Sequence, residues 1–160
     1  MNSFQIRPVN NDDKAWVTNF HAEQWGSAAN VTRGKIYNAS DFPGFIAVNQ
    51  NRRAGLALYR IDGGECEYMS MNSLVEGIGI GTALVEAVKN AAVKAGCRRL
   101  WLITTNDNTK ALRFWQKRGF NFKAVYPNAM EKSRKLKPEI PLISDDGIPI
   151  RDEIELEMLL

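Results

Sequence analysis

The stretch VEGIGIGTAL, from Val75 to Leu84, decides the fold of this chain because two different apolar patterns meet in it. Before it, apolar and polar residues alternate as in a β-strand. After Gly79, apolar residues recur at helical spacing as far as Ala95, and Gly96 is a typical helix stop. The glycine-rich stretch is therefore predicted to be the turn between a strand and a helix.

The segments on either side of this turn complete a strand–helix–strand unit. The run at 65–74, ECEYMSMNSL, alternates and is predicted to place Glu67, Met69 and Met71 on one face. The run at 98–105, RRLWLITT, is densely apolar, as expected of a buried central strand. Two strands joined by a helix lie parallel with a right-handed crossover. The sequence thus predicts one parallel pair in the middle of the sheet.

The remaining patterns predict further strands and helices around this unit. Strands are predicted at 4–9, 44–50, 54–61, 120–126 and 151–160, and helices at 10–25, after a cap at Asn106 or Asp107, and in a short basic stretch after Pro127. Residues 26–42 are predicted to be a loop with a short helix. The prolines from 127 to 149 indicate an ordered excursion over the sheet. Together these predict one α+β domain over residues 1–160, with a mixed, mostly antiparallel sheet flanked by helices.

Composition excludes several classes of function. A net charge of +3 over 160 residues is too small to indicate nucleic acid or an anionic membrane as partner. No apolar run approaches the roughly 20 residues that span a bilayer, and the N-terminus does not read as a signal peptide. Cys66 and Cys97 lack metal-like spacing and indicate reduced thiols, and one histidine argues against a metal site. We therefore expect a cytoplasmic protein without a metal.

The glycine turn could serve binding or packing. A Walker A loop needs a lysine after its last glycine, where this chain has Thr82, and the dinucleotide fingerprint fails on glycine spacing. What remains is a glycine turn at a helix start, where free amides and the helix dipole favour an anion. The alternative is a turn needed only for tight packing of strand against helix.

The turn and the later stretch TTNDNTKALRFWQKRGF (104–120) together resemble the GNAT family of acyl-CoA-dependent N-acetyltransferases. The acyl-CoA turn of that family, [RQ]-x-x-G-x-[GA], is matched by residues 76–81. Its second motif is matched by Asn108, Ala111, the Phe114–Trp115 pair and the KRGF stretch at 117–120. The resemblance covers essentially the whole chain and implies the GNAT fold, with acetyl-CoA as donor. The tail looks like that of one bacterial subgroup without an assigned substrate.

The resemblance implies a set of cofactor-binding residues. The backbone of the fourth strand would pair with pantetheine, the turn amides would hold the pyrophosphate, and the following helix would lie beside the cofactor. The matching positions are Met69, Met71, Glu76, Gly77, Ile78, Gly79, Ile80, Gly81, Thr82, Asn108, Ala111 and Phe114. Glu76 stands where the motif has arginine or glutamine, so its carboxylate would repel a pyrophosphate that it faced.

Acyl transfer to an amine requires that the ammonium lose a proton. A carboxylate on the fourth strand often acts as base in this family, which makes Glu67 the candidate and Glu65 its substitute. The alternative is an ordinary exposed strand glutamate. Trp115 takes the position where many members have a tyrosine as general acid, and an indole N–H donates but does not ionise usefully. Either the thiolate leaves unassisted or another group protonates it; the sequence does not place Tyr68 or Tyr126 there.

The expected acceptor is a primary amine of a small molecule, a peptide or a protein. The first helix and the following loop, with His21, Trp25 and Arg33, would flank its pocket, and the proline-rich tail could wall it. The basic residues Arg134, Lys135, Lys137 and Arg151 are solvated charges or, alternatively, ligands for an anionic group on the acceptor. Two other functions stay open: an acyl-CoA-binding protein with little or no catalysis, and a structural domain. A homodimer is one expected assembly.

Overall fold

The computed structural model describes residues 3–25 and 29–160. Its elements follow in the order β1 (Phe4–Pro8), η1 (Asn11–Asp13), α1 (Lys14–Trp25), β2 (Ala29–Thr32), β3 (Lys35–Asn38), η2 (Ala39–Asp41), β4 (Gly44–Asn49), β5 (Arg52–Asp62), β6 (Glu65–Ser73), α2 (Ile80–Lys94), β7 (Arg99–Thr105), α3 (Thr109–Lys117), β8 (Asn121–Tyr126), α4 (Ala129–Leu136) and β9 (Glu153–Leu159). Within the described ranges, none of the helices has the length and apolar character needed to cross a membrane.

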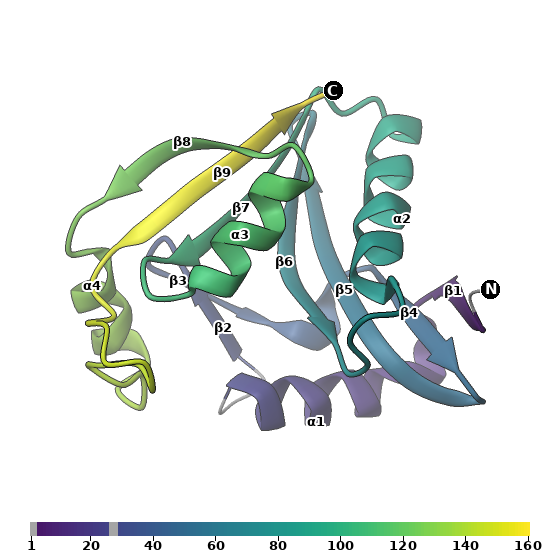
Figure 1. Ribbon diagram of the computed structural model, residues 1–160, viewed down its shortest axis with the longest axis horizontal. Coiled ribbons are helices and arrows are strands. Elements are labelled where there is room, and N and C mark those ends of the chain that lie inside the picture. Colours follow the sequence, from purple (N-terminus) through teal and green to yellow (C-terminus); the bar gives the residue numbers. More distant parts are fainter. Residues whose placement is uncertain (1–2, 26–28) are drawn as a thin grey trace.

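Seven strands form one sheet in the order β1-β4-β5-β6-β7-β9-β8 (Figure 1). Neighbouring strands are antiparallel except β6 and β7, which run parallel and are joined by α2. This arrangement confirms the predicted mixed sheet with one parallel pair in its middle.

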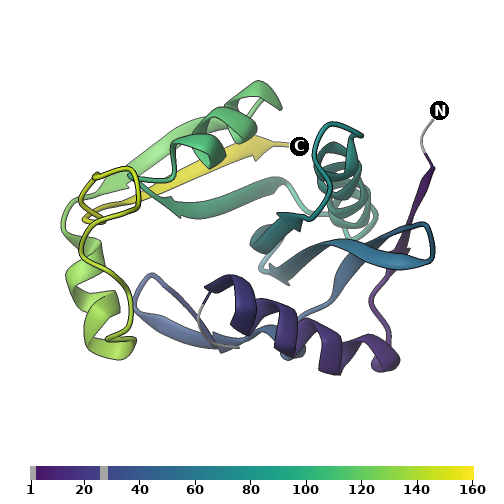
Figure 2. The same cartoon turned by 60° about the horizontal axis from the view of Figure 1, so that its bottom comes forward.

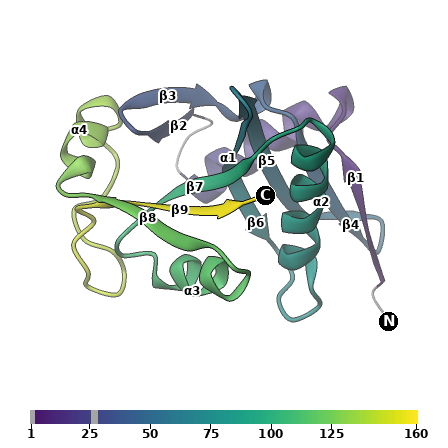
Figure 3. The same cartoon turned by 90° about the horizontal axis from the view of Figure 1, so that it is seen from above.

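Helices cover both faces of this sheet and bury two apolar cores. Under α2 and α3, the core contains Leu84 and Val88 of α2 together with Trp115 of α3. Under α1, a second core contains Val17 and Phe20. Figure 3 shows the sheet between α1 on one side and α2 and α3 on the other. The helical spacing read from the sequence thus marks the faces that the helices bury.

A β-bulge in β6 overturns the prediction about which side chains share a face. The register between β5 and β6 shifts between Leu58 and Tyr59, which leaves Met69 as the extra residue on β6. Met69 packs into the core under α1, whereas Met71 packs against the core under α2. The prediction that Met71 lies on the face of Glu67 and Met69 was therefore wrong, because strict alternation fails at a bulge.

The two central strands separate beyond this bulge. Pairing between β6 and β7 ends where Tyr68 lies beside Leu102, although β6 continues to Ser73 and β7 to Thr105. A bulge bends its strand, which accounts for the divergence. The two strand ends therefore present backbone groups to each other without ladder hydrogen bonds between them.

Residues 26–42 were predicted as a loop with a short helix, and the prediction of a loop was wrong. Residues 26–28 lie outside the described part of the chain. Beyond them, β2 and β3 form a two-stranded sheet of their own, followed by the 3-10 turn η2. The hairpin turns at Arg33 and Gly34, which have φ of 49° and 74°. A non-glycine residue at positive φ is uncommon, so this turn carries no strong signal in the sequence.

An inserted segment of residues 127–152, with α4 and a long loop, connects β8 to β9 in the sequence. It lies at one end of the molecule (Figure 2). Asn106 holds this loop, because its side-chain Nδ2 donates to the Pro149 carbonyl at 2.9 Å and its Oδ1 accepts from the Arg151 amide at 3.0 Å. Neither of the two predicted residues therefore caps α3. The cap is Asn108, whose Oδ1 accepts from the Ala111 amide at 3.2 Å.

Candidate functional site

A cavity of about 650 Å³ opens where β6 and β7 separate. Its wall combines side chains of β6, β7, α3 and α1 with the inserted segment, which contributes mainly the apolar residues Met130, Ile140, Pro141 and Ile150. Segments that are far apart in the sequence therefore build one cavity. The proline-rich excursion does form a wall of it, as the sequence suggested.

The structure brings most of the predicted site residues to this cavity or its border. Those that line the cavity are Glu67, Met69, Met71, Asn108, Ala111 and Trp115. Phe114 and the glycine turn lie next to that wall, because a Cβ on Gly81 would be 3.0 Å from Phe114 Cε1 and 3.6 Å from Met71 Cε. Close packing against Phe114 thus explains why a side chain at Gly81 would not fit without movement.

The glycine turn presents unpaired backbone amides. Gly77 and Gly79 have φ of 81° and 90°, which glycine adopts without strain. Gly79 is the N-cap of α2 and makes no side-chain cap hydrogen bond, so the first amides of the helix, at residues 80–82, have no intrahelical acceptor. These amides and the helix dipole suit an anion. Glu76 is exposed, which leaves its carboxylate in water.

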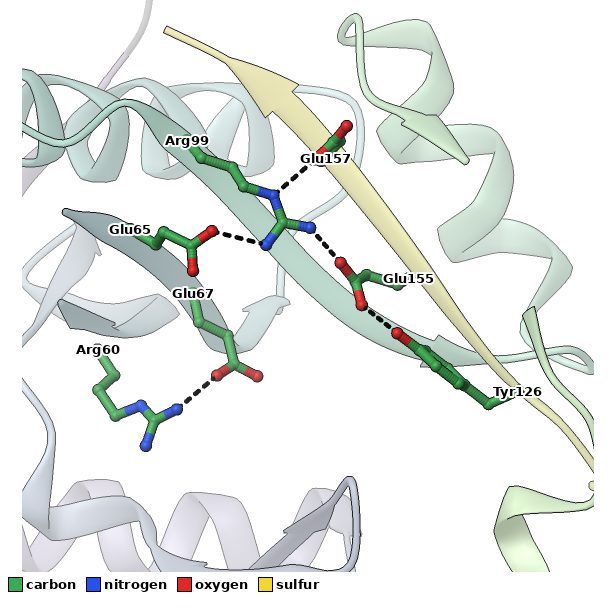
Figure 4. Close-up of polar contacts among 7 residues, drawn as sticks. All are labelled: Arg60, Glu65, Glu67, Arg99, Tyr126, Glu155 and Glu157. Atoms are coloured by element: carbon green, nitrogen blue, oxygen red, sulfur yellow. Dashed lines mark hydrogen bonds and ion pairs between the residues drawn. The ribbon is translucent and has the colours of Figure 1, made fainter. Parts of the chain in front are cut away.

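Glu67 is a buried carboxylate in the cavity wall, only 3% exposed. Its Oε1 accepts a hydrogen bond from Arg60 Nη2 at 3.2 Å (Figure 4). Burial raises the pKa of Glu67 to about 7, although the positive charge of Arg60 acts in the opposite direction. A carboxyl group that titrates near neutral pH can accept a proton from a substrate and return it to water.

Glu65, the substitute candidate, lies in a different environment. Its side chain is 43% exposed, and Arg99 Nη1 donates to it at 3.1 Å. Figure 4 shows Arg99 between Glu65 and β9, with Glu67 directed to the other side, toward Arg60. The structure thus distinguishes the two glutamates, and Glu67 is the one at the cavity.

Sequence reasoning missed a row of acids on β9. Glu153, Glu155 and Glu157 alternate with the buried apolar residues of that strand, so they lie on the opposite face. Arg99 ion-pairs with Glu155 and, at 2.6 Å, with Glu157. The negative charge of Glu155 also contributes to the raised pKa of Glu67. The alternation of acidic and apolar residues in EIELEM is the sequence signal that predicts this acidic face.

Neither tyrosine left open by the sequence is free to protonate a thiolate. The Tyr68 hydroxyl donates to the Val85 carbonyl at 2.9 Å, and burial raises its pKa. The Tyr126 hydroxyl donates to Glu155 at 2.6 Å, a bond that raises its pKa as well. Trp115 lines the cavity with its ring centroid 4.8 Å from that of Tyr68.

The end of the cavity away from the turn contains residues of α1, the β2–β3 hairpin and the inserted segment. His21 is buried in the wall. Glu153 also lines the cavity and accepts from the Arg33 amide at 3.3 Å and from Arg33 Nη1 at 3.4 Å. Arg33 therefore contacts the cavity wall through its hydrogen bonds to Glu153. The side chain of Trp25 lies outside the described part of the structure.

Of the four basic residues in the tail, only Lys137 lines the cavity, where burial lowers the pKa of its ammonium group. Arg134 donates to the Pro141 carbonyl at 2.8 Å, and Arg151 Nε donates to Asp152 at 2.9 Å. Lys135 is exposed. Arg134 and Arg151 thus hold the inserted loop rather than face the cavity.

The chain matches one protein-family model and is similar to two bacterial proteins. Residues 12–120 match the model of the family described as the acetyltransferase (GNAT) family. Two proteins of Bacillus subtilis (strain 168), the uncharacterized proteins YdhI and YxbD, are similar over nearly their whole length. YdhI is 47% identical over 150 residues, which cover 93% of this chain and 94% of that protein. YxbD is 42% identical over 152 residues, which cover 94% and 96%.

Solved structures resemble the fold at low sequence identity. An IAA acetyltransferase from Bacillus cereus ATCC 14579 aligns with a TM-score of 0.72 and 19% identity, covering 99% of this chain and 100% of that one. A GNAT family acetyltransferase from Elizabethkingia anophelis, crystallised with acetyl-CoA bound, aligns with a TM-score of 0.71 and 19% identity over 100% of both chains. These similarities show that the chain has the fold of these acetyltransferases.

Proposed function

Because the chain belongs to the GNAT acetyltransferase family, we propose that it transfers the acetyl group of acetyl-CoA directly to the nitrogen of a primary amine. The acceptor is a small molecule or an amine of a peptide or protein. The observation that carries the proposal is the placement of Glu67, a buried carboxylate with a pKa raised to about 7 in the wall of the cavity.

The donor site is proposed at the glycine turn and the separated strands. The amides of residues 77–82 would hold the pyrophosphate. The backbone of β6 around Met69 and Met71, on the edge that no longer pairs with β7, would bind the pantetheine arm. Asn108, Ala111 and Phe114 would lie beside the cofactor. Support comes from the unpaired first-turn amides of α2 and from the end of β6–β7 pairing at Tyr68.

In the proposed reaction, Glu67 removes a proton from the acceptor ammonium, directly or through one water. The freed nitrogen lone pair forms the C–N bond to the thioester carbonyl carbon. The C–S bond breaks, and its electron pair leaves with the sulfur as thiolate. The second proton, which the acylated nitrogen still carries, passes to this thiolate or to water, so that a neutral amide forms. The products are an N-acetyl amide and coenzyme A, and Glu67 later returns its proton to water.

The cavity wall favours an acceptor amine that carries an apolar body. Apolar residues of the inserted segment line the same cavity as the carboxylates of Glu67 and Glu153. Carboxylates attract an ammonium group, while the apolar wall gains from the exclusion of water. We further propose that residues 1–160 form a single acyltransferase domain that works in the cytoplasm, in keeping with two free, buried cysteines.

The direct test is to incubate the purified protein with acetyl-CoA and a panel of amines, including aryl-alkylamines, aliphatic diamines and peptides. We expect thiol release with at least one amine, and mass spectrometry should find a product with one added acetyl group that resists hydroxylamine. A hydroxylamine-labile product would show transfer to oxygen and contradict the proposal.

Exchanging Trp115 for tyrosine tests whether a general acid is missing. We expect Trp115→Tyr to change kcat by less than about tenfold. A thiolate whose conjugate thiol has a pKa near 8.5 is stable enough to leave without protonation. The measurement is kcat at pH 7–8 at saturating acetyl-CoA, with a melting curve to verify folding. A gain of about 100-fold or more would show that the absent acid limits the reaction.

The second candidate function is an acyl-CoA-binding protein with little catalysis. It is favoured by one observation: the cavity contains Trp115 where an acid would act, while the hydroxyl of Tyr68 is bound to the Val85 carbonyl. Acetyl-CoA binding by calorimetry without thiol release for any amine would support it over the enzyme.

A further inference from the structure

The proposed donor site lacks a cation in the segment that should bind the phosphates. Residues 75–82 contain no lysine or arginine, and Glu76 takes the position where the family motif has arginine or glutamine. Backbone amides carry only partial charges, whereas phosphate sites commonly add an arginine that forms charge-assisted hydrogen bonds. The question is whether another part of the chain supplies this charge.

Arg118, at the C-terminal end of α3, reaches the first turn of α2. Its Nη2 donates to Thr82 Oγ1 at 2.7 Å, and its Nη1 donates to the Phe114 carbonyl at 2.9 Å. The guanidinium lies 3.5 Å from the centroid of the Phe114 ring, which also packs against Gly81. These three contacts fix a positive charge at the start of α2, where an anion would bind.

Among the residues that the structure describes, the charge of Arg118 has no counter-ion. Within residues 3–25 and 29–160, the ion pairs engage Arg7, Arg33, Arg53, Arg60, Arg99 and Arg151 but not Arg118. Its Nε is buried and has no partner among these residues, and partial burial lowers the pKa of the guanidinium. An arginine stays charged in proteins, so this cation is partly desolvated and its contacts with Thr82 and Phe114 bring no negative charge to it. An anionic ligand would relieve that cost.

We propose that Arg118 is the phosphate-binding cation of the acyl-CoA site and contacts the pyrophosphate. The assignment rests on the proposed function, and it explains how the turn tolerates Glu76. Each terminal nitrogen of Arg118 donates one N–H to the protein and has a second N–H for the ligand. Thr82 and Phe114 orient the guanidinium before the ligand arrives, which reduces the ordering cost of binding.

The test compares Arg118→Gln with wild type in titrations of three probes. Calorimetry measures CoA and 3′-dephospho-CoA, and NMR titration in the millimolar range measures S-acetylpantetheine, which lacks the pyrophosphate. We expect the substitution to weaken CoA and dephospho-CoA by about tenfold to 100-fold, as for loss of a charge-assisted hydrogen bond, and to leave S-acetylpantetheine unchanged. Arg118→Lys, which keeps the charge, should recover part of the affinity.

The matched control is Lys117→Gln, which removes the same charge from the neighbouring exposed position. We expect it to change CoA affinity by less than about threefold, because this side chain is solvated. Equal CoA affinity in Arg118→Gln and wild type would overturn the inference. So would a loss confined to CoA, which would indicate the 3′-phosphate, or an equal loss for S-acetylpantetheine, which would indicate a structural role.

Failure of the proposed function gives a different result. If wild type binds none of the three probes, the acyl-CoA site itself is wrong, and the inference about Arg118 falls with it. If wild type binds CoA and Arg118→Gln binds it equally well, the acyltransferase proposal stands and only the role of Arg118 is refuted.

Discussion

Replacement of Glu67 with glutamine is expected to lower kcat/KM for amine acetylation by about 100-fold to 10,000-fold, the usual contribution of a general base. Glutamine keeps the size of the side chain but cannot accept the proton of the ammonium group. The measurement is thiol release with the best amine of the panel. Calorimetry should give a Kd for acetyl-CoA within about threefold of wild type, because the carboxylate acts on the acceptor.

Glu65→Gln is the matched control for this substitution. Glu65 lies two residues earlier on β6 but is bonded to Arg99 outside the cavity wall. We expect its replacement to change kcat/KM by less than about threefold, whereas Glu67→Gln should lose the contribution of a general base. A Glu67→Gln variant that retains more than a tenth of the activity would contradict the role of Glu67 as base.

The pH dependence follows from the raised pKa of Glu67. The base acts in its ionised form, so kcat/KM of wild type should rise as pH increases from 6 to 8, with a midpoint at about 7. The residual activity of Glu67→Gln should lack this inflection. An inflection that persists in the variant would assign the titration to another group.

The same substitution should stabilise the fold at alkaline pH. The pKa of Glu67 is higher in the folded state, at about 7, than its ordinary value of 4.5. This difference adds to the free energy of unfolding below pH 4.5, and the added stability is lost as pH rises through about 7. The difference between 4.5 and about 7 corresponds to about 3 kcal/mol at most. Urea unfolding should therefore find Glu67→Gln more stable than wild type at pH 8 and equal to it at pH 4.

Asp13→Ala is expected to lower the free energy of unfolding by about 3 kcal/mol, which is typical of removing one partner from a buried ion pair. Asp13 is 1% exposed and accepts hydrogen bonds from Arg7 at 2.7 and 2.9 Å and from Arg53 Nε at 3.0 Å. It also accepts from the Asn10 amide at 2.8 Å in a capping box. One carboxylate thus joins β1, β5 and the start of α1.

Urea denaturation at pH 7 measures this loss, and Asp12→Ala is the control. Asp12 is the exposed neighbour in the same turn, so its replacement should cost less than about 0.5 kcal/mol. The Arg7 hydrogen bonds hold the pKa of Asp13 well below its usual range, so its contribution is complete above pH 4 and decreases as pH falls further. Equal stability of the two variants at pH 7 would refute the role of Asp13.

The glycine turn, the second motif and the helical spacing after Gly79 were enough to predict the strand–helix–strand unit and its parallel pair, since periodicity and turn chemistry are local properties. They also identified Glu67 and Trp115, which the cavity brings together. Local signals failed where a residue depends on its partners in space. The bulge at Met69 arises from pairing with β5, and the turn at Arg33 adopts a conformation that its sequence does not favour.

The sequence by itself therefore determined the order of elements outside residues 26–42, the family and the residues that we propose for the site. Only the tertiary structure decided the pKa values of those residues and which other residues contact them. Burial, rather than residue type, raises the pKa of Glu67, and it distinguishes Glu67 from Glu65 on the same strand. The contact between Arg118, at the end of α3, and Thr82 of α2 joins two residues that are 36 positions apart in the sequence. Desolvation and long-range contacts depend on the packed chain, which no local pattern encodes.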